Sequence, residues 1–159
     1  MAQPDTKTEG TARLKYVTYC GLYCGLCANM ARIPKQAHAL RETLVKEGYE
    51  YFGKDSIEGF EPFWKALERL SRMDESCPGC RSEQCGDPGC RISKCAKAKG
   101  MEVCSACPKF PCKHFQGLAE RYPNLIADAK RQQKVGLDQW IEEQERRIKT
   151  GFSYADIRY

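Results

Sequence analysis

Residues 77–112 of this 159-residue chain read CPGCRSEQCGDPGCRISKCAKAKGMEVCSACPKFPC. Eight of the eleven cysteines lie here, among many glycines and prolines and few large apolar residues. Such a segment lacks the side chains for a conventional core, so its shape must come from crosslinks or from bound metal. Only Arg91 to Lys99 has the pattern of a short helix, which Gly100 would end.

The spacing of the cysteines favours metal ligation. A Cys-x-x-Cys pair forms a tight turn that lets both sulfurs reach one zinc ion at about 2.3 Å. The chain has three such pairs, Cys24/Cys27, Cys77/Cys80 and Cys104/Cys107. The other candidate ligands are Cys20, Cys90, Cys95 and Cys112. Since a closed structural site takes four ligands, we expect about two zinc ions per chain.

The spacing alone leaves open which cysteines share an ion. A sequential grouping has Cys77, Cys80, Cys90 and Cys95 in one site, and Cys104, Cys107 and Cys112 with Cys20, Cys24 or Cys27 in the other. An interleaved grouping joins Cys24/Cys27 to Cys104/Cys107. Cys85 belongs to no pair, and two tetrahedral sites need only eight ligands. We therefore expect Cys85 to be a spare thiol.

Two other cysteine chemistries compete with zinc. A disulfide framework suits a secreted chain, but the first residues are polar and the cysteine count is odd. An iron–sulfur cluster uses the same all-cysteine ligands and is the alternative cofactor. The spacing Cys20-x-x-x-Cys24-x-x-Cys27 also resembles that of radical S-adenosylmethionine enzymes, yet the alternating strands and helices of their barrel are missing.

Charge and hydropathy limit which classes of partner the chain can be expected to bind. The formal net charge is +5, the mean hydropathy is −0.63, and no apolar run is long enough for a membrane span. Thiolates bound to zinc would offset much of the positive charge, so it is weak support for a nucleic-acid partner. A basic turn does lie at Arg91, Lys94, Lys97 and Lys99, but no aromatic residues interleave with it for base stacking.

Periodicity predicts a helical chain around the cysteine-rich insert. We expect an α-rich domain over 16–159 with irregular, metal-stabilised cysteine segments and little strand, preceded by a flexible arm over 1–15. The predicted helices cover 34–46, 62–73, 115–122, 124–134 and 138–149. We also expect a short strand at 16–19, an aromatic connector at 49–52, and a tail at 152–159 that packs back onto the domain.

No catalytic constellation is visible in the sequence. There is no triad, phosphate loop or paired-histidine motif, and a zinc ion saturated by sulfur has no open position for a substrate. The only histidines are His38 and His114, and with eleven thiols available we expect neither to ligate. The sequence thus favours a cytoplasmic zinc-binding protein that acts as a protein-interaction or regulatory module and is not an enzyme. A nucleic-acid-binding zinc protein and an iron–sulfur redox protein are the alternatives.

The ordered cysteine motifs resemble those of a known family. They are Cys20-Gly21-Leu22-Tyr23-Cys24-Gly25-Leu26-Cys27, Cys77-Pro78-Gly79-Cys80-Arg81, Cys90-Arg91-Ile92-Ser93-Lys94-Cys95-Ala96, Cys104-Ser105-Ala106-Cys107-Pro108 and Phe110-Pro111-Cys112. In this order they resemble domain-of-unknown-function family 3795, small cysteine-rich proteins of prokaryotes. The resemblance covers about residues 16–115, implies zinc binding and supplies no reaction. Cys85 has no place in the family pattern.

Overall fold

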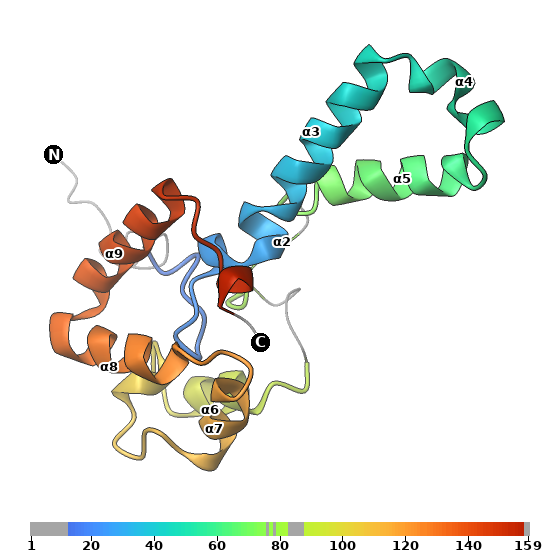
Figure 1. Ribbon diagram of the computed structural model, residues 1–159. Helices are drawn as coiled ribbons and strands as arrows, with labels where there is room; N and C mark the ends of the chain where they lie inside the picture. The colour runs from blue at the N-terminus through green and yellow to red at the C-terminus, as the bar shows by residue number, and fades with distance from the viewer. Residues whose placement is uncertain (1–12, 76, 78, 83–87, 158–159) are drawn as a thin grey trace, which may run out of the picture. The chain divides into compact units, whose positions relative to one another are not determined.

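The fold is given by a computed structural model, which describes residues 13–75, 77, 79–82 and 88–157 (Figure 1). The described chain is mainly helical, which confirms the predicted α-rich fold class. In the predicted short strand, Val17 forms an isolated antiparallel bridge with Tyr23, the single β feature of the described residues. No helix in this part of the chain is both long and apolar enough to cross a bilayer.

The helical elements divide between two compact units, unit 1 (Met1–Leu26 and Pro78–Tyr159) and unit 2 (Cys27–Cys77). The elements are η1 (Cys24–Leu26), α2 (Ala28–Ala31), α3 (Ile33–Lys46), α4 (Tyr49–Ser56), α5 (Phe60–Ser71), α6 (Arg91–Ala98), η2 (Cys104–Ala106), α7 (Lys113–Ala119), α8 (Leu125–Val135), α9 (Leu137–Lys149) and η3 (Tyr154–Asp156). The single domain over 16–159 stays a prediction. Most of the predicted arm, residues 1–12, lies outside the described residues, and Leu14 is already buried in unit 1.

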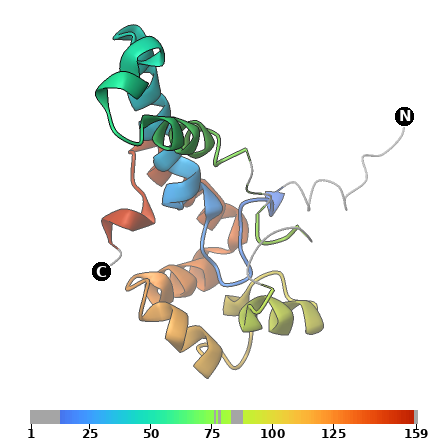
Figure 2. The same cartoon turned by 90° about the vertical axis from the view of Figure 1, so that its right-hand side faces the viewer.

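Unit 2 is a helical hairpin with a short helix at its tip. Both views show α5 running back along α3, with α4 between them (Figures 1 and 2). Pro34 lies in the first turn of α3, where its missing N–H leaves no bond unmade. The predicted aromatic connector over 49–52 is wrong, because these residues form the start of the helix α4. Gly53 of α4 allows a close approach of the Phe60 ring, since a Cβ there would lie 2.4 Å from that ring.

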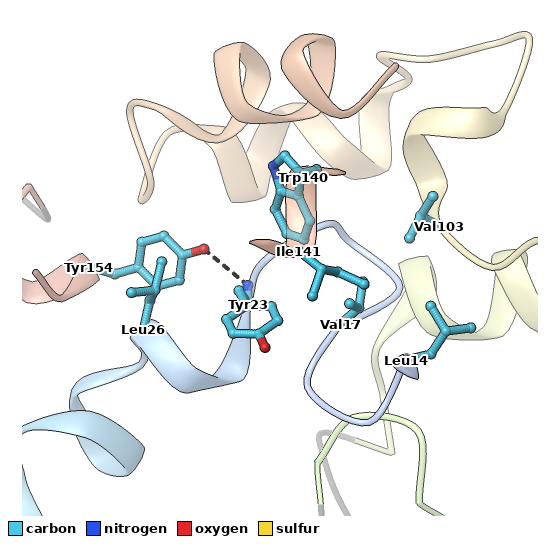
Figure 3. Close-up of a cluster of buried hydrophobic side chains, with 8 residues drawn as sticks. All are labelled: Leu14, Val17, Tyr23, Leu26, Val103, Trp140, Ile141 and Tyr154. Carbon is cyan, nitrogen blue, oxygen red and sulfur yellow. Dashed lines mark hydrogen bonds between the residues drawn. The ribbon is translucent and has the colours of Figure 1, made fainter. Parts of the chain in front are cut away.

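The first core of unit 1 joins residues that are far apart in the sequence (Figure 3). Trp140 of α9 is fully buried, and its ring meets Tyr23 edge-on with 6.0 Å between the centroids. The backbone N–H of Tyr23 donates to the Tyr154 hydroxyl at 3.0 Å. The Ser153 hydroxyl donates to the Leu26 carbonyl at 3.0 Å. The aromatic tail therefore packs back onto unit 1, as predicted.

A second core positions the cysteines of unit 1. The buried side chains of Ile92 in α6, Phe115 in α7, and Leu125 and Ala129 in α8 form this core. Four partly buried cysteines pack against it, namely Cys20, Cys90, Cys104 and Cys112. Helix packing thus fixes the backbone from which these thiols project.

Candidate metal centre

Four of the predicted ligands line one pocket of about 290 Å³ in unit 1. Cys95 lies on α6, Cys104 begins η2, Cys107 directly follows η2, and Cys112 directly precedes α7. All four are half-buried free thiols. This set differs from both groupings considered from the sequence, because Cys95 lies with the three later cysteines and not with the preceding ones.

Tight turns present these thiols to the pocket. Gly100 follows α6 with a φ of 62°, in the left-handed region that favours glycine. The N–H of Cys107 donates to the Cys104 carbonyl at 3.0 Å, and the N–H of Phe110 donates to the Cys107 carbonyl at 2.9 Å. The Phe110 ring then meets buried Phe115 edge-on, with 4.5 Å between centroids. The Cys104/Cys107 pair thus lies in a hydrogen-bonded turn, and the aromatic contact of Phe110 with Phe115 packs the following residues on the apolar core.

The pKa of the Cys104 thiol reflects both its burial and its neighbouring cysteines. Burial raises the pKa of Cys104 to about 11, and the negative charge of neighbouring thiolates adds to the rise. Those neighbours are Cys112, Cys107, Cys95 and Cys20. Cys104 is therefore protonated at neutral pH in the metal-free chain. Metal ligation would replace that proton, because thiolate is the ligating form.

Lysines supply positive charge at the rim of the pocket. The Lys99 ammonium donates to the Cys107 sulfur at 3.7 Å. Charge on Cys107, and then on Cys95, raises the pKa of Lys99. Lys109 and Lys113 line the same pocket. Since Lys99 is exposed, solvent screens much of its interaction with the sulfurs.

In unit 1, Cys80 and Cys90 lie near enough to Cys20 for their charge to act on its thiol, and these three cysteines are called the second group below. Burial raises the pKa of Cys20, a hydrogen bond with Thr18 Oγ1 at 3.0 Å opposes the rise, and charge on Cys80 and Cys90 adds to it. Cys90 also caps α6, where its sulfur accepts from the N–H of Ser93 at 3.5 Å. The sequential grouping already placed Cys80 with Cys90, and the new member is Cys20, which lies sixty residues earlier in the sequence than Cys80.

Arg81, a residue whose structural role is not evident from the sequence, links this second group to the N-terminal segment. Its Nε donates to the Val17 carbonyl at 2.6 Å, and its guanidinium lies 4.5 Å from the centre of the Tyr19 ring. It also donates to the Glu102 carbonyl. The one available sequence signal is its position directly after Cys80, which by itself does not reveal the long-range contacts.

Apart from His114, the remaining cysteines and histidines do not line the four-cysteine pocket. Cys24 begins η1, while Cys27 and Cys77 are the first and last residues of unit 2. His114 lines the four-cysteine pocket, and exposed His38 on α3 lies 3.8 Å from the Glu42 carboxylate. Cys85 lies outside the described residues. The ligand assignments of these residues stay predictions.

The thiols do not form a closed coordination sphere. Within 13–75, 77, 79–82 and 88–157, no three Cys, His, Asp or Glu side chains are close enough to hold one ion. The ten described cysteines are all free, so no disulfide joins any two of them. The donor chemistry of the pocket nevertheless fits zinc, which prefers thiolate ligands. Ligation there requires the sulfurs to move inward, to about 2.3 Å from the ion.

One family comparison matches the chain. A family model described as "Protein of unknown function (DUF3795)" matches residues 16–117. This span covers all ten candidate metal ligands, from Cys20 to Cys112. No curated protein and no solved structure matches the chain.

Proposed function

The chain belongs to the family described as Protein of unknown function (DUF3795), and we propose that it is a metal-binding protein whose cysteines hold structural zinc. The observation that carries the proposal is the pocket of unit 1 lined by Cys95, Cys104, Cys107 and Cys112. Four thiolates around one ion make a closed structural zinc site. The second group, Cys20, Cys80 and Cys90, would supply three ligands of a further site, and the effect of charge on Cys80 and Cys90 at Cys20 supports this.

In this proposal zinc acts as a crosslink. At the four-cysteine pocket it joins the end of α6, the turn η2 and the start of α7. The segment contributes few buried apolar side chains of its own, chiefly Ile92 and Val103. The free energy of zinc binding would therefore serve as folding free energy for this part of the chain.

We propose a cytoplasmic protein of prokaryotic type that works by binding another protein. The three Cys-x-x-Cys pairs, a spacing typical of metal sites, support a reducing compartment, where disulfides are rare. A zinc ion with four sulfur ligands has no vacant position, so its role is to hold the protein's shape.

An iron–sulfur cluster is the second candidate, since the same four thiols supply its ligands. It would make the chain a redox protein or an enzyme subunit. Metal identity separates the two candidates directly.

Cobalt substitution tests the thiolate site. We expect anaerobic addition of Co²⁺ to the metal-free full chain to produce sulfur-to-cobalt charge-transfer bands and the visible absorption of tetrahedral cobalt, saturating at about two equivalents. Added zinc should displace the cobalt and abolish the bands. A spectrum with no thiolate bands would contradict the proposal.

A further inference from the structure

Exposed apolar side chains are concentrated in unit 2. Six large apolar side chains are exposed in the described part of the chain, and five of them belong to this unit, although unit 1 is the larger. They are Leu40, Tyr51, Phe52, Ile57 and Phe63. Four of the five fall between residues 51 and 63, on α4, in the turn that follows it and on α5. Exposed apolar side chains that are contiguous on a surface are typical of interaction sites.

The exposed rings are held from behind by other rings. Phe52 contacts Tyr49 at 4.8 Å between centroids, and Tyr49 stacks on buried Phe60 at 6.3 Å. Phe60 also contacts Phe63 at 6.1 Å and stacks on Trp64 at 5.4 Å. Phe52 and Phe63 are still 42% and 41% exposed. Because this ring cluster already fixes their rotamers, a partner would lose little entropy in ordering them.

Exposed carboxylates lie in the same stretch of the chain as these rings. Between residues 47 and 61 the chain has five acidic residues and a single basic one, Lys54. The acidic residues are Glu47, Glu50, Asp55, Glu58 and Glu61, and all are exposed. Among the described residues, none of the five is in an ion pair. Their charges are therefore available to a partner.

We propose that this acidic aromatic surface, made of Tyr51, Phe52, Ile57, Phe63 and the five carboxylates, docks a basic segment of a partner protein. The segment's apolar anchors would cover the rings, and its lysines or arginines would face the carboxylates at the rim. An anionic membrane or a nucleic acid would instead be repelled by this rim. The surface contains no cysteine, so the proposal stands or falls independently of zinc.

Two synthetic peptides of equal length and apolar content test the choice of partner. Both are 16-residue amphipathic helices of leucine and tryptophan, with lysine at every polar position in one and glutamate in the other. We expect the full chain to bind the lysine peptide at least tenfold more tightly, by fluorescence anisotropy. Amide NMR shifts on binding should be confined to residues 47–63.

Matched variants locate the contact. Tyr51 is 81% exposed, and Tyr51→Ser should weaken binding of the lysine peptide at least fivefold without unfolding the unit, while Leu40→Ser at another exposed site should not. Glu50→Lys should weaken it at least fivefold, and Asp74→Lys should leave it unchanged. Circular dichroism would verify that all four variants fold.

Three outcomes would overturn the proposal. If the two peptides bind equally tightly, the proposed preference for a basic partner is wrong. If the variants at Tyr51 and Glu50 bind the lysine peptide as tightly as their controls do, the peptide does not bind at the proposed surface. If analytical ultracentrifugation shows that the chain alone forms a dimer, and that Tyr51→Ser makes it monomeric, the surface binds a second copy of the chain instead.

Discussion

At the residue scale, Cys104 shows how the fold holds a cysteine of the four-cysteine pocket. The backbone N–H of Cys104 donates to the Tyr19 carbonyl at 2.7 Å, so the residue is fixed while its thiol faces the pocket. Its raised pKa keeps it protonated, and hence a poor nucleophile, until a metal ion displaces the proton.

Substitution of a pocket cysteine should remove one metal ion. Cys107→Ser deletes one of four ligands, and we expect it to lose one zinc ion per chain and about 3 kcal/mol or more of the free energy of unfolding. Cys85→Ser is the matched control, with full zinc content and a change within about 0.5 kcal/mol. Zinc analysis and denaturant titration of both variants measure this. If Cys85→Ser loses the ion and Cys107→Ser retains it, the ligand assignment is wrong.

Zinc affinity should fall steeply on acidification. The pKa of Cys104 is about 11 and the pKa of Cys20 is also raised, so both thiols carry protons at neutral pH in the metal-free chain. Each protonated ligand costs about tenfold in affinity per unit of pH decrease, because protons compete with the ion. We therefore expect proton release on binding, measured by calorimetry in two buffers of different ionisation enthalpy. Binding without proton release would contradict thiol ligation.

At the element scale, most helices follow from local sequence. Pro34 at the start of α3, the stop at Gly100 after α6 and the position of Asn124 before α8 were all predicted from the sequence. The last helix was predicted to begin at Asp138, but α9 begins one residue earlier, at Leu137. The Asp138 carboxylate therefore lies in the first turn, where it favours the helix dipole and pairs with Arg13.

Features that depend on tertiary contacts were not predictable. Residues 49–52 read as an aromatic connector, but they form the start of α4, whose rings pack on Phe60 of α5. The cysteines were identified as ligands by spacing, but their grouping was not. That grouping depends on contacts such as Arg81 to Val17 and Tyr19, which join segments far apart in the sequence.

Two glycines inside helices should respond oppositely to alanine. A Cβ at Gly53 in α4 would lie 2.4 Å from the Phe60 ring, so Gly53→Ala should destabilise unit 2 by about 1–3 kcal/mol. A Cβ at Gly117 in α7 meets nothing within 4 Å, so Gly117→Ala should stabilise by about 0.5–1 kcal/mol through helix propensity. Thermal unfolding of both variants measures the difference. Equal effects would show that Phe60 does not pack against α4.

At the scale of the whole molecule, the two units differ in what holds them. Unit 2 has a ring cluster centred on buried Phe60, with α3 packed on α5. Unit 1 has two apolar cores, and its cysteine segments lie beside them. Loss of metal should therefore affect the cysteine segments of unit 1 before it affects unit 2.

Chelation should expose this difference by hydrogen exchange. We expect removal of metal from the full chain to abolish amide protection in 88–112 first, while α3 and α5 of unit 2 keep theirs. Mass spectrometry of peptic fragments resolves the two regions. Unchanged protection over 88–112 in the metal-free chain would mean that an apolar core, not metal, holds this segment.

The most direct measurement is the metal content of the full chain, purified without oxygen, together with its optical spectrum. If thiolates hold structural zinc, we expect about two zinc ions per chain and a colourless protein, because zinc has no visible absorption. A brown protein with stoichiometric iron and sulfide would contradict zinc and identify an iron–sulfur protein. A colourless chain without metal, still fully folded, would contradict metal binding altogether.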